Sequence, residues 1–64
     1  MSPHIERVYN ERVVLLEKIA ALRKFLSGKL FMTLPAADRE LLSCQVLVMK
    51  MYADILDRRI ALSY

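Results

Sequence analysis

Residues 41–62 read LLSCQVLVMKMYADILDRRIAL, a run with a clear helical pattern. Positions three and four residues apart form one face of an α-helix, and two such series can be followed along this run. The principal series consists of Leu41, Gln45, Val48, Tyr52, Ile55, Arg59 and Leu62. A flanking series consists of Leu42, Met49, Leu56 and Ile60. Because a helix with so wide an apolar face is buried from more than one direction, this pattern predicts a helix with at least two neighbours.

A second long helix is predicted earlier in the chain, over about residues 3–26. Ser2 and Pro3 are a typical helix start, because a hydroxyl can cap the first turn and proline lacks only an N–H that is unpaired there. The principal series of this helix consists of Ile5, Val8, Arg12, Leu15, Ile19, Leu22 and Leu26. A flanking series consists of Tyr9, Val13, Leu16 and Ala20. Ser27 and Gly28 should end the helix, with Gly28 in the left-handed conformation that favours glycine at a C-cap.

The connection, residues 27–35, is too apolar for a loose solvated loop, so we expect it to fold back onto the helices. Pro35 disfavours a helical conformation at the preceding residue, so the second helix should begin near residue 36 and end near residue 62. Two helices of similar length joined by a short connection pack as antiparallel neighbours. A fold-back about residue 32 would place Arg12 opposite Tyr52 and Ile19 opposite Gln45.

The length and composition of the chain point to self-association. Sixty-four residues provide one small core. A single cysteine excludes an internal disulfide, and one cysteine with one histidine gives too few ligands for a structural zinc site. Hydrophobic residues make up 56% of the chain, and one hairpin cannot bury both flanking series. We therefore predict an all-α protein, an antiparallel two-helix hairpin that assembles into a four-helix bundle or a larger homo-oligomer. The expected interface residues are Val13, Leu16, Val46, Leu47, Met49 and Met51.

Several classes of function are not expected. His4 and Cys44 have no neighbours that would make them catalytic, so we predict no enzyme activity, no metal and no cofactor. The charged residues Glu6, Arg7 and Glu11 interrupt any signal-peptide core, and uncharged stretches are much shorter than a membrane span, which predicts a cytoplasmic protein. The net charge of +3 gives only a modest basic patch, so a nucleic-acid partner is not expected.

Polar residues interrupt the two principal series, and each would need a partner if buried. In one interpretation, Arg12 pairs with Asp54 or with the Tyr52 hydroxyl, and Arg59 pairs with Glu6. These pairs would then fix the helix register and the oligomeric state, as single polar residues do in coiled coils.

In the other interpretation, the polar residues bind an anion at an oligomer interface. Guanidinium groups match phosphate oxygens, and tyrosine rings stack on nucleotide bases. The candidate ligand-binding residues are Arg12, Arg58, Arg59, Tyr9 and Tyr52. The sequence leaves both interpretations open.

The chain resembles a known group of small proteins. The matching residues run from Glu11 to Phe25, through Phe31 and Leu34, and from Asp38 to Ile60, with Gln45, Met49, Tyr52 and Arg59 as the distinguishing positions. In these residues the chain resembles small phage and prophage proteins related to a crAssphage protein, which are single helical hairpins. The resemblance implies a phage origin. It also implies a likeness in build to phage anti-defence sponges, oligomeric hairpins that sequester cyclic nucleotide immune signals.

The leading hypothesis from the sequence is therefore a counter-defence protein that binds a cyclic or phosphorylated nucleotide between subunits. An alternative is a protein that inhibits a host defence protein by direct binding through Lys18, Arg23 and Lys24. A purely structural or regulatory oligomer is a third possibility, for which neither ligand nor host partner is expected.

Overall fold

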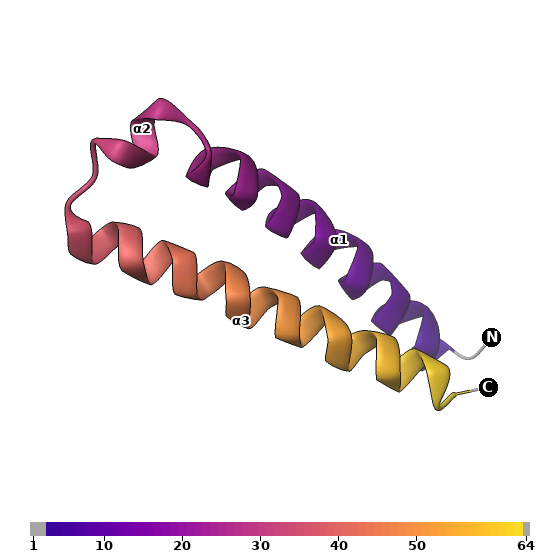
Figure 1. Ribbon diagram of the computed structural model, residues 1–64. Helices are drawn as coiled ribbons and strands as arrows, with labels where there is room; N and C mark the ends of the chain where they lie inside the picture. The colour runs from indigo at the N-terminus through magenta and orange to yellow at the C-terminus, as the bar shows by residue number, and fades with distance from the viewer. Residues whose placement is uncertain (1–2, 64) are drawn as a thin grey trace.

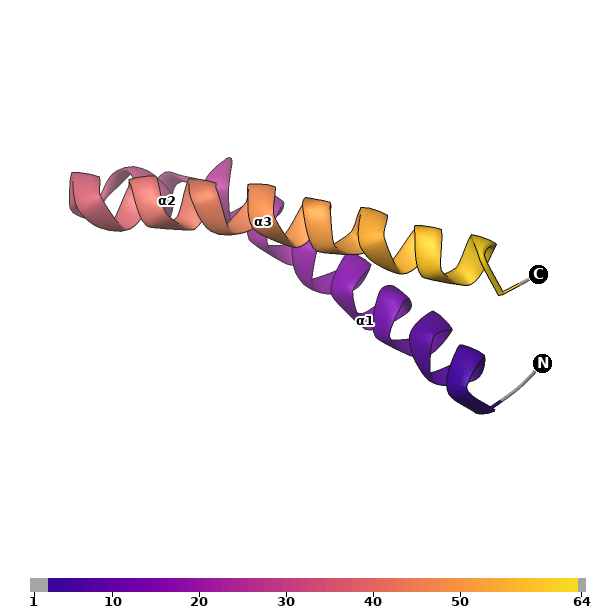
Figure 2. The ribbon, with the colours of Figure 1, turned by 90° about the horizontal axis from the view of Figure 1, so that it is seen from below.

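The computed structural model describes residues 3–63, which form three helices: α1 (Pro3–Leu26), α2 (Lys29–Met32) and α3 (Ala36–Ala61). Helices α1 and α3 run antiparallel, and the two described ends of the chain lie at the same end of the hairpin (Figure 1). Seen from below, the two long helices cross at an angle (Figure 2). The hairpin is a rod of 46 × 14 × 13 Å. The predicted all-helical hairpin is thus confirmed, whereas its assembly into an oligomer stays a prediction.

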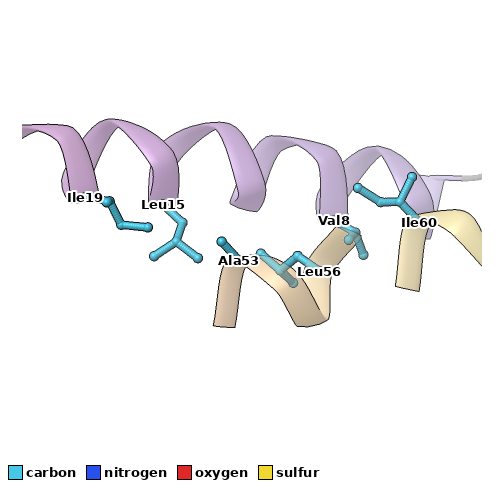
Figure 3. Close-up of a cluster of buried hydrophobic side chains, with 6 residues drawn as sticks. All are labelled: Val8, Leu15, Ile19, Ala53, Leu56 and Ile60. Atoms are coloured by element: carbon cyan, nitrogen blue, oxygen red, sulfur yellow. The ribbon is translucent and has the colours of Figure 1, made fainter. Parts of the chain in front are cut away.

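The core is a single row of apolar side chains between α1 and α3. Six of them form one cluster (Figure 3): Val8, Leu15, Ile19, Ala53, Leu56 and Ile60. Leu56 is completely buried, and Tyr9 and Met49 pack against the edge of the cluster. Among the described residues no polar or charged side chain is buried, so the interior between the two helices is held together by hydrophobic burial.

The face of α1 that packs on α3 is the predicted one. Its principal series contains the three buried residues of the helix, and the other members of the series are half-buried. The prediction for α3 is wrong by one position. The face that contacts α1, here called the inner stripe, consists of Leu42, Val46, Met49, Ala53, Leu56 and Ile60. The series expected there is exposed along its whole length. It is called the outer stripe and consists of Leu41, Gln45, Val48, Tyr52, Ile55, Arg59 and Leu62.

The polarity of the two stripes explains which one is buried. All six residues of the inner stripe are apolar, whereas the outer stripe contains an amide, a phenol and a guanidinium group. Burying such groups without partners costs free energy, because their hydrogen bonds to water are lost. The hairpin therefore packs on the inner stripe and leaves Gln45, Tyr52 and Arg59 at the surface.

The connection contains a one-turn helix, and Gly28 does not have the expected conformation. Gly28 is extended, with φ −92° and ψ 169°, and acts as the N-cap of α2. The chain continues into α2 rather than reversing at the end of α1, so no left-handed residue is needed there. The Ser27 hydroxyl donates to the Lys24 carbonyl at 2.9 Å and caps the end of α1. The ring of Phe31 packs edge-on against Phe25 with centroids 6.3 Å apart, which fixes α2 against α1.

Helix α2 also changes the register of the hairpin. Arg12 pairs with Asp57, five positions beyond the Tyr52 expected opposite it. The reason is that α2 carries the chain past the end of α1 before α3 begins, so that the first turns of α3 lie beyond α1 (Figure 1). Ile19 accordingly belongs to the same cluster as Met49 and Ala53, and Gln45 lies outside it. Within residues 3–63, neither long helix has an apolar segment suited to crossing a bilayer.

Candidate functional site

Two polar pairs flank the core of the hairpin. Arg12 Nε donates to a carboxylate oxygen of Asp57, and the Tyr52 hydroxyl donates to a carboxylate oxygen of Glu11. Glu11 and Arg12 are consecutive, so their side chains point about 100° apart around α1 and lie on opposite sides of the core. The two pairs therefore connect α1 to α3 along both edges of the apolar row. The Arg12 side chain is 35% exposed and that of Asp57 is 51% exposed, so the ion pair adds less to stability than burial does.

These pairs correct the expected partners. Asp57, not Asp54 or the Tyr52 hydroxyl, is the partner of Arg12, and the partner of Tyr52 is Glu11. Glu11 is the neighbour of Arg12, which the expected register placed opposite Tyr52, but it was not among the expected partners. Arg59 and Glu6 are both exposed, and no ion pair between them is found in residues 3–63.

The five candidate ligand-binding residues do not converge within one chain. Arg12 and Tyr52 are bonded to carboxylates on opposite edges of the hairpin, and Tyr9 packs against the core. Arg58 and Arg59 are exposed near the end of α3, and neither forms an ion pair with a carboxylate of residues 3–63. These two arginines are thus the members of the set that can accept an anion without first breaking an ion pair.

The expected oligomer-interface residues fall into two groups. Val13, Leu16, Leu47 and Met51 are exposed, as a contact surface requires. Val46 is buried and Met49 is packed against the core, since both belong to the inner stripe that contacts α1 of the same chain. Within the single hairpin, Val46 thus has almost no exposed surface and Met49 keeps part of its surface exposed.

An extended apolar surface along α3, the outer stripe, is left uncovered in the hairpin. Its apolar members Leu41, Val48, Ile55 and Leu62 are 52–87% exposed. Arg59 lies within the stripe between Ile55 and Leu62, and Arg58 lies next to it. The candidate site is therefore this stripe together with Arg58 and Arg59 at its carboxyl end, which form no ion pair within the described part of the chain.

A shallow groove of about 360 Å³ borders the outer stripe between α1 and α3. It is lined by Asn10, Glu11, Val14, Leu15, Lys18 and Tyr52. Sequence reasoning did not place Asn10 or Val14 at a site, because both lie outside the principal and flanking series of α1. Within residues 3–63, no group of three or more potential metal ligands is present.

The Tyr52–Glu11 hydrogen bond changes the titration of the phenol. The hydrogen bond to Glu11, partial desolvation and the negative charge of Glu11 raise the pKa of Tyr52 above its ordinary value of 10.0, and Arg59 opposes this shift. A raised pKa means that the folded protein keeps a proton that the unfolded chain releases. The contribution of this bond is thus fully present below pH 10.0 and is lost as the pH rises through the pKa of the folded state.

We expect Tyr52→Phe to remove this pH dependence. Below the ordinary pKa of tyrosine, near 10, the variant should have a lower free energy of unfolding than the unmodified chain, because the bond to Glu11 is absent. Above that pH the difference between the two proteins should shrink. Urea unfolding of both proteins from about pH 8 to about pH 12 measures the difference between their free energies of unfolding. The contributions of the other titrating groups cancel in this difference. Two curves that stay parallel over this range would contradict the assignment.

Fold and surface together define the chain as a small helical-hairpin protein with an uncovered apolar stripe. Residues 2–62 match the family model described as Sequestin, and the chain belongs to this family. The family name refers to sequestration.

One relative is a protein of Enterobacteria phage T4 described as an uncharacterized 7.5 kDa protein in the denB-rIIB intergenic region. It is 47% identical over 61 residues, which cover 95% of each chain. This relative supports the expected phage origin, while the family is Sequestin rather than the crAssphage-related group. No solved structure matches the chain.

Proposed function

We propose that this chain is a non-enzymatic phage counter-defence protein, a homo-oligomer that sequesters a cyclic or otherwise phosphorylated nucleotide signal between its subunits. Membership of the Sequestin family supports a sequestering role, and the T4 relative supports a phage context. The observation that favours a nucleotide ligand is the pair Arg58 and Arg59, which are exposed beside an apolar stripe and form no ion pair with a carboxylate of residues 3–63.

The chemistry of these residues favours a phosphorylated ligand. Two adjacent guanidinium groups offer several N–H donors in planar arrays, which match the oxygens of a phosphodiester. The neighbouring Ile55 and Leu62 would contact the apolar faces of a base or ribose. Arg12 and Tyr52 contribute less than the sequence predicted, because a ligand would have to compete with Asp57 and Glu11 for them.

Isothermal titration calorimetry of the full chain against cyclic dinucleotides and cyclic trinucleotides tests the proposal. We expect saturable heat for at least one of them, and the double variant Arg58→Glu/Arg59→Glu should weaken it at least tenfold. The reason is that each charge-assisted hydrogen bond contributes about 1.5–3 kcal/mol.

The matched control is Lys29→Glu/Lys50→Glu, which makes the same change of charge at two exposed positions outside the outer stripe. This control should bind like the unmodified chain. An absence of heat with every nucleotide, or equal weakening by both double variants, would contradict a site at Arg58 and Arg59.

A further inference from the structure

The hairpin exposes more surface than a compact monomer of its size. Its accessible surface is 5039 Å² for 7.4 kDa, whereas a folded monomer of this mass exposes about 4,200 Å². The excess of about 800 Å² equals what each partner buries in a protein–protein interface of ordinary size. The excess exposed surface is therefore as large as the area that one subunit buries in a subunit interface.

The outer stripe has a symmetry that fits a second copy of itself. Counting outward from the midpoint between Met51 and Tyr52, the four aliphatic residues of the stripe form two pairs at equal distances, Val48 with Ile55 and Leu41 with Leu62. In an antiparallel pairing about this midpoint, Leu41 faces the partner's Leu62, and Val48 faces the partner's Ile55. We propose that α3 of a second copy docks antiparallel on the outer stripe in this register, about a twofold axis between Met51 and Tyr52.

Charge favours the antiparallel arrangement over the parallel one. In a parallel pair, Arg58 and Arg59 would lie beside the same two residues of the partner, and these like charges repel. In the antiparallel pair they lie at the level of the uncharged Cys44 and Gln45 of the partner. Glu40 of the partner is about one helical turn further on, which adds an opposite charge within reach of a long arginine side chain.

The antiparallel pairing of α3 does not depend on the proposed function. Only its consequence for the number and position of the ligand sites rests on that function. The Arg59 residues of the two copies lie fifteen residue levels apart, which is about 22 Å along the helix axis. They therefore belong to two separate sites rather than to one shared site. Each site combines Arg58 and Arg59 of one copy with the amide of the partner's Gln45, so the expected stoichiometry is one ligand per subunit.

Disulfide cross-linking tests the register without any ligand. The variant Arg59→Cys places a thiol at the level of the partner's native Cys44, and both positions are exposed in the single hairpin. Mild oxidation should convert most of this variant to a species of twice the 7.4 kDa chain mass on a non-reducing gel. A second pair, Leu41→Cys with Leu62→Cys in a Cys44→Ser background, should give the same result.

Two single-cysteine proteins provide the controls. The unmodified chain, with Cys44 alone, and Arg59→Cys combined with Cys44→Ser should both stay monomeric on the gel, because identical positions lie about 22 Å apart in the antiparallel pair. Efficient cross-linking of either control would show a parallel pair, and no cross-linking of either two-cysteine variant would show that the outer stripes do not meet. Each of these results would overturn the proposed pairing. Cross-linking without nucleotide binding would contradict only the proposed function.

Discussion

Replacing Leu56 with alanine is expected to lower the free energy of unfolding by about 2–5 kcal/mol, the usual cost of truncating a fully buried leucine. Leu56 has no exposed surface and lies in the middle of the cluster between α1 and α3 (Figure 3). A chain of 64 residues has a total stability of only about 3–10 kcal/mol. A large part of the protein should therefore be unfolded, and urea denaturation followed by far-UV circular dichroism measures the loss.

The matched control is Leu30→Ala, because Leu30 in α2 is 70% exposed and belongs to neither stripe of α3. Its free energy of unfolding should change by less than about 0.5 kcal/mol. Both variants must be compared at one protein concentration, since the stability of an oligomer depends on concentration. Equal losses for the two substitutions would show that the inner stripe is not the core.

The sequence was sufficient to predict the hairpin and the packing face of α1, because one series on that helix is clearly the more apolar. On α3 two series compete, and the longer one, which predicts the packing face by its spacing, contains Gln45, Tyr52 and Arg59. The cost of burying these polar groups was the signal that could have separated the two series. The purely apolar series through Val46 and Ala53 is the one that the hairpin buries.

The polar pairs could not be predicted from the sequence because they depend on the register, which the connection determines. Helix α2 adds one turn that the apolar composition of residues 29–32 did not reveal, and this turn moves α3 relative to α1. Arg12 then reaches Asp57 instead of Asp54, whereas Tyr52 bonds to Glu11, the neighbour of the residue expected opposite it. A small change in a connection can therefore change the partner of a cross-helix polar group.

Part of the high hydrophobic content of the chain lies in the outer stripe, which is exposed in the single hairpin. A monomeric protein rarely leaves a contiguous apolar face of this kind in water, and such faces mark sites of interaction. Since Arg58 and Arg59 lie at the end of the same face, binding of another copy and binding of an anion would take place next to each other. One substitution in the stripe should therefore affect both properties.

Replacing Val48 with aspartate is expected to separate the subunits. Val48 is 63% exposed in the single hairpin, so the change leaves the core of the chain untouched. In the proposed pair it faces the partner's Ile55, where two carboxylates per dimer would be buried without partners at a cost of several kcal/mol. The dissociation constant should rise by about a thousandfold or more, which sedimentation equilibrium at micromolar concentration measures.

Ser43→Asp is the matched control, because it adds the same charge at an exposed position of α3 that belongs to neither stripe. The control should sediment like the unmodified chain, whereas Val48→Asp should sediment as a species of one 7.4 kDa chain. If the nucleotide site is completed by Gln45 of the partner, Val48→Asp should also lose nucleotide binding although Arg58 and Arg59 are unchanged. An unchanged mass for Val48→Asp would show that the outer stripe is not the subunit interface, and another exposed face such as that of Val13 and Leu16 would have to provide it.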